Sequence, residues 1–100
     1  MLRITVDEGP RAVTIKLEGK VVGSWVGEFD RTWHSLEHVW GSKRFSLDLR
    51  DVSFVDAEGR QLMHEIYRRT GAAFLTNSPL TTYFAEEAMQ TTPKNGLQGA

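Results

Sequence analysis

Residues 47–62 read LDLRDVSFVDAEGRQL, and this stretch decides the fold. Leu47 and Leu49 alternate with polar residues, which is typical of a β-strand with one buried and one wet face. Asp56 suits a helix N-cap, because its carboxylate can accept backbone N–H bonds at the positive end of the helix dipole. Gly59 lets the first helical turn pack closely, or lets another chain approach it. The stretch therefore predicts a strand that passes directly into a helix.

Three further segments have the pattern of strands. Apolar and polar residues alternate over residues 2–7 and again over residues 13–18. Turn-forming residues at 8–11 lie between these two segments and favour a hairpin. A short apolar run at residues 72–76 predicts a fourth strand.

An aromatic stripe precedes the deciding stretch and predicts the first helix. Ser24 is the expected N-cap and Gly41 the expected stop of this helix. The apolar residues at helical spacing are Trp25, Phe29, Trp33, Leu36 and Trp40. We expect most of these rings to fill the space between helix and sheet, with Trp25 the best candidate to face a partner.

Two more helices are expected after Asp56. The second has its apolar stripe at residues 62–67 and ends at Thr70-Gly71. The third begins at Ser78, the N-cap, followed by Pro79 in the first turn. Its expected apolar face consists of Leu80, Tyr83, Phe84 and Ala88.

The order of elements predicts an α/β domain. Strands that are followed by a helix and then by another strand imply right-handed parallel crossovers. Because each strand keeps one polar face, we expect a mixed four-strand sheet with about three helices packed mainly on one face. This domain spans residues 1–90, and the polar residues 91–100 are expected to form a flexible tail.

Composition excludes several classes of function. The chain has 100 residues, 40% of them hydrophobic, no cysteine and a formal net charge of −1. This balance gives no field that favours nucleic acid, and the absence of cysteine excludes disulfides. No apolar run is long enough for membrane insertion or a secretory signal, so we expect a cytoplasmic protein.

The chain resembles the STAS domain, the fold of bacterial anti-sigma-factor antagonists that is also found in sulfate transporter tails. The residues that carry the resemblance are Val52, Phe54, Asp56 and Gly59, together with Gly19 and the Ser78-Pro79 pair followed by Leu80 and Phe84. In regulatory members of that family a Ser follows the Asp, and a kinase-type anti-sigma factor phosphorylates it to release the antagonist. Here Ala57 occupies that position and has no hydroxyl group.

Two interpretations of this departure stay open. Ala57 can leave the surface always competent to bind. Alternatively, Glu58 supplies a fixed negative charge, although its charge of about −1 is a poor substitute for the −1.5 to −2 of a phosphate. We favour the first interpretation, and we do not transfer the phosphoacceptor role to Ser53, which lies before the turn.

The resemblance implies a non-enzymatic protein–protein interaction module of bacterial signalling without a cofactor. It would act like an anti-sigma-factor antagonist and bind a kinase-type regulator through the loop at residues 19–27, the turn at Asp56 and the helix after it. The predicted partner-binding residues are Gly23, Ser24, Trp25, Asp56, Ala57, Glu58, Gly59, Arg60 and His64. Two alternatives stay open: a small STAS subunit that partners the ATPase of an ABC-type lipid transporter, and a sensor of a nucleotide or lipid. The sequence also leaves a homodimer open.

Other polar constellations favour less specific interpretations. His34, Glu37 and His38 lie on one helical segment but lack the spacing of known zinc motifs, so we expect an exposed polar face and no metal site. Arg60, His64 and Arg68 are four residues apart and predict a solvated stripe, or a docking site if the partner is acidic.

Overall fold

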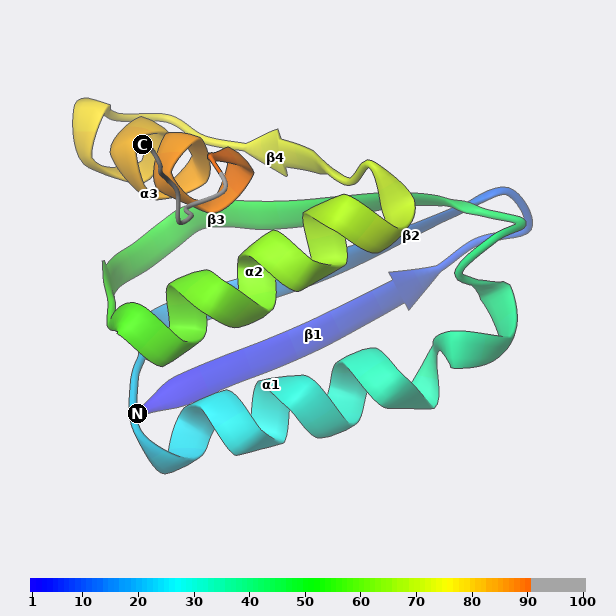
Figure 1. Cartoon of the computed structure of the whole chain (residues 1–100), viewed down its shortest axis with the longest axis horizontal. Helices are drawn as coiled ribbons and strands as arrows, with labels where there is room; N and C mark the ends of the chain where they lie inside the picture. The colour runs from blue at the N-terminus through cyan, green and yellow to red at the C-terminus, as the bar shows by residue number, and fades with distance from the viewer. Residues whose placement is uncertain (91–100) are drawn as a thin grey trace, which may run out of the picture.

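The computed structural model describes residues 1–90, so the expected tail at residues 91–100 lies outside the described residues. In chain order the elements are β1 (Leu2–Glu8), β2 (Ala12–Val21), α1 (Ser24–Ser35), the 3₁₀ turn η1 (Glu37–Val39), β3 (Arg44–Val55), α2 (Ala57–Thr70), β4 (Ala73–Leu75) and α3 (Pro79–Met89). The predicted alternation of strands and helices is confirmed, with η1 as the addition (Figure 1). No helix within residues 1–90 has both the length and the apolar character needed to cross a membrane.

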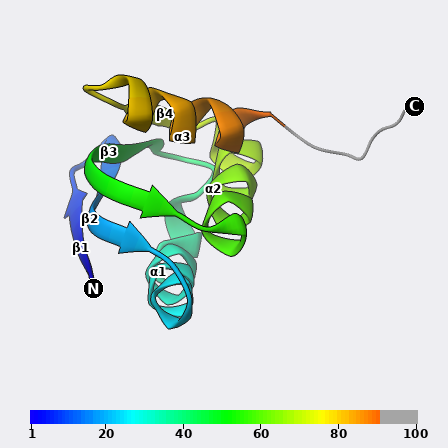
Figure 2. The same cartoon turned by 90° about the vertical axis from the view of Figure 1, so that its left-hand side faces the viewer.

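The four strands form one mixed sheet in the order β1-β2-β3-β4. β1 pairs antiparallel with β2, whereas β2, β3 and β4 run parallel to one another. α1 and α2 lie against one face of this sheet, and α3 packs on α2 and along β3 (Figure 2). The predicted sheet and the predicted placement of the helices are confirmed.

The core lies between the sheet and the helices α1 and α2. Strand side chains that point toward the helices are completely buried, as the alternating pattern predicts. The largest fully buried side chains are Trp33 and Phe29 from α1, Ile15, Leu17, Leu47 and Leu49 from the sheet, and Met63 and Ile66 from α2. These side chains fill the space in which a sensor domain would hold a ligand.

Two irregularities in the pairing of β2 with β3 change which residues of β3 face the core. At each of them the ladder advances one residue further along β3 than along β2. Leu49 and Val52 are therefore both buried despite their odd spacing, while Phe54 is 52% exposed. The simple alternation in the sequence ends at the first of these bulges.

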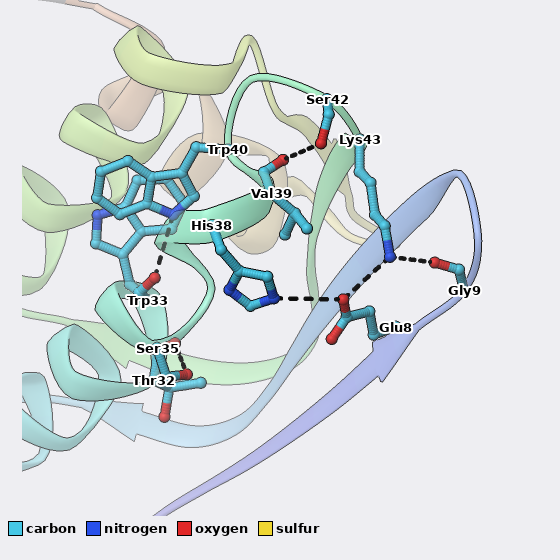
Figure 3. Close-up of polar contacts among 10 residues, drawn as sticks. All are labelled: Glu8, Gly9, Thr32, Trp33, Ser35, His38, Val39, Trp40, Ser42 and Lys43. Carbon is cyan, nitrogen blue, oxygen red and sulfur yellow. Dashed lines mark hydrogen bonds and ion pairs between the residues drawn. The ribbon is translucent and has the colours of Figure 1, made fainter.

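The prediction of a single helix from Ser24 to Gly41 is wrong. α1 ends at Ser35, and after η1 the chain turns back so that Trp40 stacks on Trp33, with ring centroids 4.0 Å apart. The indole N–H of Trp40 donates to the Trp33 carbonyl at 3.2 Å (Figure 3). The last carbonyls of a helix lack partners within the helix, so this contact stabilises the early end.

The same end of the molecule is tied to the β1–β2 turn. Lys43 Nζ lies 3.0 Å from Glu8 Oε2 and donates to the Gly9 carbonyl at 2.8 Å (Figure 3). His38 Nε2 approaches the same carboxylate oxygen at 3.9 Å. These contacts fix the entry of β3 at the end of the sheet opposite to Asp56.

The beginning of α3 is confirmed, but its predicted apolar face is partly wrong. Ser78 caps the helix through the backbone N–H of Thr81, and the Thr81 hydroxyl accepts from the Ser78 N–H in return. This capping box turns Thr81 inward, and the buried face consists of Thr81, Phe84, Ala85 and Ala88. Leu80 and Tyr83 are consequently 49% and 53% exposed.

Replacement of Gly59 should destabilise the fold, because a Cβ atom there would lie 2.7 Å from the Val21 carbonyl oxygen. We expect Gly59→Ala to lower the free energy of unfolding by roughly 1–3 kcal/mol. Gly27→Ala is the matched control, since a Cβ at Gly27 meets no atom within 4 Å and alanine favours a helix. Urea denaturation followed by circular dichroism measures both, and equal stability of the two variants would contradict the close packing.

Candidate functional site

The carboxylate of Asp56 joins the starts of two helices. Its Oδ1 accepts from the Gly59 N–H at 2.8 Å, which is the expected N-cap of α2. Its Oδ2 accepts from the Gly23 N–H at 2.9 Å. Gly23 stands at the N-cap position of α1 with a φ of 56°, so the predicted N-cap Ser24 is wrong. No side-chain hydrogen bond from its N-cap residue closes the start of α1, and Asp56 instead binds the backbone N–H of that residue.

These hydrogen bonds favour the ionised form of Asp56. The backbone N–H of Gly23, and after it that of Gly59, holds the pKa of this carboxyl below its usual value, while desolvation opposes the shift. A carboxylate that is charged throughout the neutral range thus anchors both helix starts, where the helix dipoles also favour a negative charge.

The first turn of α2 packs directly on the end of β2. The Asp56 N–H donates to the Val21 carbonyl at 3.1 Å, and Gly59 faces Val21 and Val55 so closely that no side chain fits. Gly59 therefore serves close packing inside this chain. The segment between β2 and α1 is only residues 22–23, much shorter than the expected loop at residues 19–27.

Ala57 and Glu58 are exposed at the tip of α2, between two hollows in the surface. Ala57 borders a hollow of about 210 Å³ between α2 and α3. Glu58 borders a groove between α1 and α2. Ala57 and Glu58 thus form a ridge between these two hollows.

The groove between α1 and α2, here called the α1–α2 groove, has an acidic rim. Asp30 comes from α1, and Glu58 and Glu65 come from α2. Val26 and Leu62 supply its apolar lining, and both are packed partly against the core. No motif in the sequence indicates this groove, although the spacing of Glu58, Leu62 and Glu65 places them on one helical face.

The other flank of α2 is already engaged within the chain. Arg60 lies 3.5 Å from Glu87 on α3, and His64 Nδ1 lies 2.7 Å from the Ala88 carbonyl oxygen. The prediction of a solvated stripe from Arg60 to Arg68 is therefore wrong at His64, which is half-buried. Trp25, the expected anchor, is also half-buried against the core.

The histidines of the first helical segment lie in ordinary polar contacts. His34 Nδ1 lies 3.2 Å from Asp30 Oδ1, whereas His38 turns toward Glu8 on β1. Within residues 1–90 no group of three or more His, Cys, Asp or Glu side chains is placed to hold a metal ion.

No protein-family model matches the sequence, and no curated protein matches it. Solved structures do match. The chain superposes on an anti-sigma factor antagonist from Mycobacterium paratuberculosis with a TM-score of 0.71 at 14% identity, over 83% of this chain and 74% of that one. It also superposes on an antisigma-factor antagonist STAS domain from Rhodobacter sphaeroides with a TM-score of 0.59 at 19% identity, over 89% and 96%.

This is the STAS fold. A third match, to an uncharacterized protein from Shewanella loihica with a SpoIIAA-like fold, has a TM-score of 0.58 at 12% identity and covers 99% of this chain and 84% of that one. The STAS resemblance of the sequence is thereby confirmed at the level of the fold.

Removal of the Asp56 charge should weaken the fold in a pH-dependent way. Asparagine offers only one acceptor oxygen, so we expect Asp56→Asn to lower the free energy of unfolding by about 1–2 kcal/mol at pH 7. Because the folded pKa is lowered, the stabilisation is complete above the unfolded value of about 3.9 and is lost as the pH falls through the folded value.

Urea denaturation of the wild type and of Asp56→Asn between pH 7 and pH 2.5 measures the difference in their free energies of unfolding. Asp51→Asn is the control, because Asp51 has an exposed side chain and pairs with Lys16 only at the surface, 3.6 Å away. If the free energy of unfolding of Asp56→Asn differed from that of the wild type by the same amount down to the lowest pH, this would contradict the role of the charge.

Proposed function

We propose that this STAS domain is a protein–protein interaction module of bacterial signalling that binds a kinase-type anti-sigma regulator in the cytoplasm. The observation that carries the proposal is the Asp56 carboxylate, which holds the starts of α1 and α2 as one rigid unit. Ala57 and Glu58 lie exposed on that unit. The fold shared with two anti-sigma factor antagonists supports the class of partner.

The partner surface in this proposal consists of the ridge at Ala57 and Glu58 and the α1–α2 groove beside it. Ala57 has no hydroxyl group, so phosphate cannot release a partner at this position. The domain would act by occupying a surface of the regulator and would catalyse no reaction. Any control of the complex must then come from the partner or from another position.

The charge of the α1–α2 groove favours a basic partner segment. Glu58 has no ion-pair partner within residues 1–90, and Asp30 and Glu65 pair only with residues of their own helices. A segment with lysine or arginine at the rim and an apolar side chain on Val26 and Leu62 would complement this groove. The Arg60 side of α2 offers less to an acidic partner, because Glu87 already pairs with it.

The unswitchable Ala57 also suits the second candidate, a STAS subunit that stays bound to the ATPase of a lipid transporter. Such a subunit needs an interface that is not released. Ala57 suits this need, because a residue without a hydroxyl group cannot be phosphorylated. The identity of the bound protein separates the two candidates.

Affinity capture from the source organism tests the interface. Ala57→Asp would bury an unpaired carboxylate at the contact, so we expect it to retain the partner at least about tenfold less well than the wild type. Ala12→Asp is the matched control, because Ala12 is exposed at the opposite end of β2. Mass spectrometry identifies the retained proteins.

Each result of this capture has a defined meaning. A kinase-type regulator that is retained by the wild type and Ala12→Asp but lost with Ala57→Asp supports the proposal. Equal retention by all three baits would show that the partner does not contact Ala57. Retention of an ATPase together with a permease would replace the proposal by the transporter subunit.

Charge reversal in the groove tests the chemistry of the partner. With the purified partner, we expect Glu58→Lys to weaken binding roughly fivefold at low salt, and this effect to shrink as salt screens the rim. Glu86→Lys is the control, because Glu86 is exposed on α3 outside the groove. Unchanged binding of Glu58→Lys in calorimetric titrations would contradict a basic segment in the groove.

A further inference from the structure

β1 is the one long strand edge that the described residues leave uncovered. It is the outermost strand of the sheet and pairs with β2 alone over its seven residues (Figure 2). The other outermost strand, β4, has only three residues, and α3 packs beside it along β3. An unpaired edge is a template for pairing with another chain.

The hydrogen bonds of the hairpin show which backbone groups of β1 point outward. The Lys20 N–H donates to the Met1 carbonyl at 3.2 Å, and the Gly9 N–H donates to the Ala12 carbonyl at 2.8 Å. Antiparallel ladders alternate between hydrogen-bonded and non-hydrogen-bonded pairs, so the odd residues of β1 bond to β2. The N–H and C=O groups of Leu2, Ile4, Val6 and Glu8 therefore point to the open edge.

This edge has little of the usual protection against pairing. Natural edge strands carry lysine, proline, an inward-pointing charge or a bulge, or they are very short. β1 contains no lysine or proline, and its register with β2 runs without a shift. Its side chains toward the helix layer are apolar from Leu2 to Val6, and Val6 is 37% exposed. Glu8 at the end of the strand is the one charge on this face, and Lys43 pairs with it.

We propose that two copies of this chain pair through β1 in antiparallel register, with Thr5 on the two-fold axis. This register pairs the whole strand with itself and brings the outward-pointing even residues opposite one another, as the ladder requires. It places Arg3 opposite Asp7 of the second copy twice, and Ile4 opposite Val6 twice. This register pairs both Arg3 and Asp7 with an opposite charge, while Glu8, which faces Leu2 of the second copy, keeps its pair with Lys43.

The side chains involved are free to form these contacts. The Arg3 side chain is 78% exposed and reaches Glu18 only at 4.0 Å. Asp7 is exposed and has no ion pair within residues 1–90. Arg3 and Asp7 would form a non-hydrogen-bonded pair, the kind in which opposite side chains lie closer together.

Pairing of this kind joins the two four-stranded sheets into one. Directly opposite residues of antiparallel strands point to the same face, so the helices of both copies would cover the same side. The two ridges at Ala57 would lie at opposite ends of the joined sheet. The dimer does not depend on the proposed partner, but it would present two partner surfaces in one particle.

Charge exchange at the edge tests the register. By sedimentation analysis over a range of concentrations, we expect the wild type to reach twice the monomer mass. Arg3→Asp and Asp7→Arg should each stay monomeric, because like charges would face each other twice. An equimolar mixture of the two variants should regain the dimer, since the carboxylate introduced in one variant would then meet the guanidinium introduced in the other.

A cross-link locates the axis independently of charge. Thr5→Cys would place two thiols opposite each other at a Cα separation of about 4.5 Å, within the disulfide range of about 4.4–6.8 Å. Thr14→Cys is the matched control, because Thr14 lies on β2, one strand away from the edge. The chain has no other cysteine.

Rapid oxidative cross-linking of Thr5→Cys, but not of Thr14→Cys, supports the proposal, as does recovery of the dimer in the mixed charge variants. A wild type that stays monomeric while Thr5→Cys does not cross-link would overturn it. A dimer that persists unchanged in both single charge variants would place the interface elsewhere. Circular dichroism shows that each variant is folded, and none of these results depends on a signalling partner.

Discussion

One carboxylate holds together the starts of two helices of this fold. Asp56 leaves β3, caps α2 and, through its second oxygen, holds the backbone of Gly23 at the start of α1. The starts of α1 and α2 follow different strands, so the covalent chain alone does not fix their positions relative to each other. The Asp56 carboxylate, which accepts hydrogen bonds from both starts, fixes them. The lowered pKa of this carboxyl keeps it charged at neutral pH. The ridge and the α1–α2 groove exist as one surface because of this contact.

The close approach of α2 to β2 is the second constraint, and it depends on the first. Asp56 fixes where α2 begins, and Gly59 then lies against the Val21 carbonyl, where only a hydrogen atom fits. A longer side chain would push α2 away from the sheet and widen the gap to α1. The glycine therefore shapes the proposed partner surface through packing, without offering a contact of its own. In the proposed function, its exposed neighbours Ala57 and Glu58 make the contacts.

Local signals in the sequence were sufficient for the fold but not for the site. Alternation, Ser78-Pro79 and the Gly71 stop predicted the elements because each acts within a few residues. The bond from Gly23 to Asp56 spans 33 positions and leaves no local pattern, which is why the sequence alone favours Ser24 as the cap. The apolar stripe through Trp40 gave the wrong prediction of one continuous helix for a similar reason. A helix and a chain that folds back can place the same rings together, and only the Trp33–Trp40 stack distinguishes them.

The two flanks of α2 differ in whether their charged residues are already paired within residues 1–90. Arg60 looks like a docking residue in the sequence, yet α3 neutralises it through Glu87. The sequence around Glu58 does not single it out as a docking residue. The structure nevertheless leaves Glu58 without an ion-pair partner in residues 1–90, on the rim of an apolar groove. On β1, Arg3 reaches its cross-strand neighbour Glu18 only at 4.0 Å, and Asp7 has no ion-pair partner in residues 1–90. The two proposals therefore rest on charges without an ion-pair partner in residues 1–90 that lie beside a further feature, an apolar groove for Glu58 and an open strand edge for Asp7.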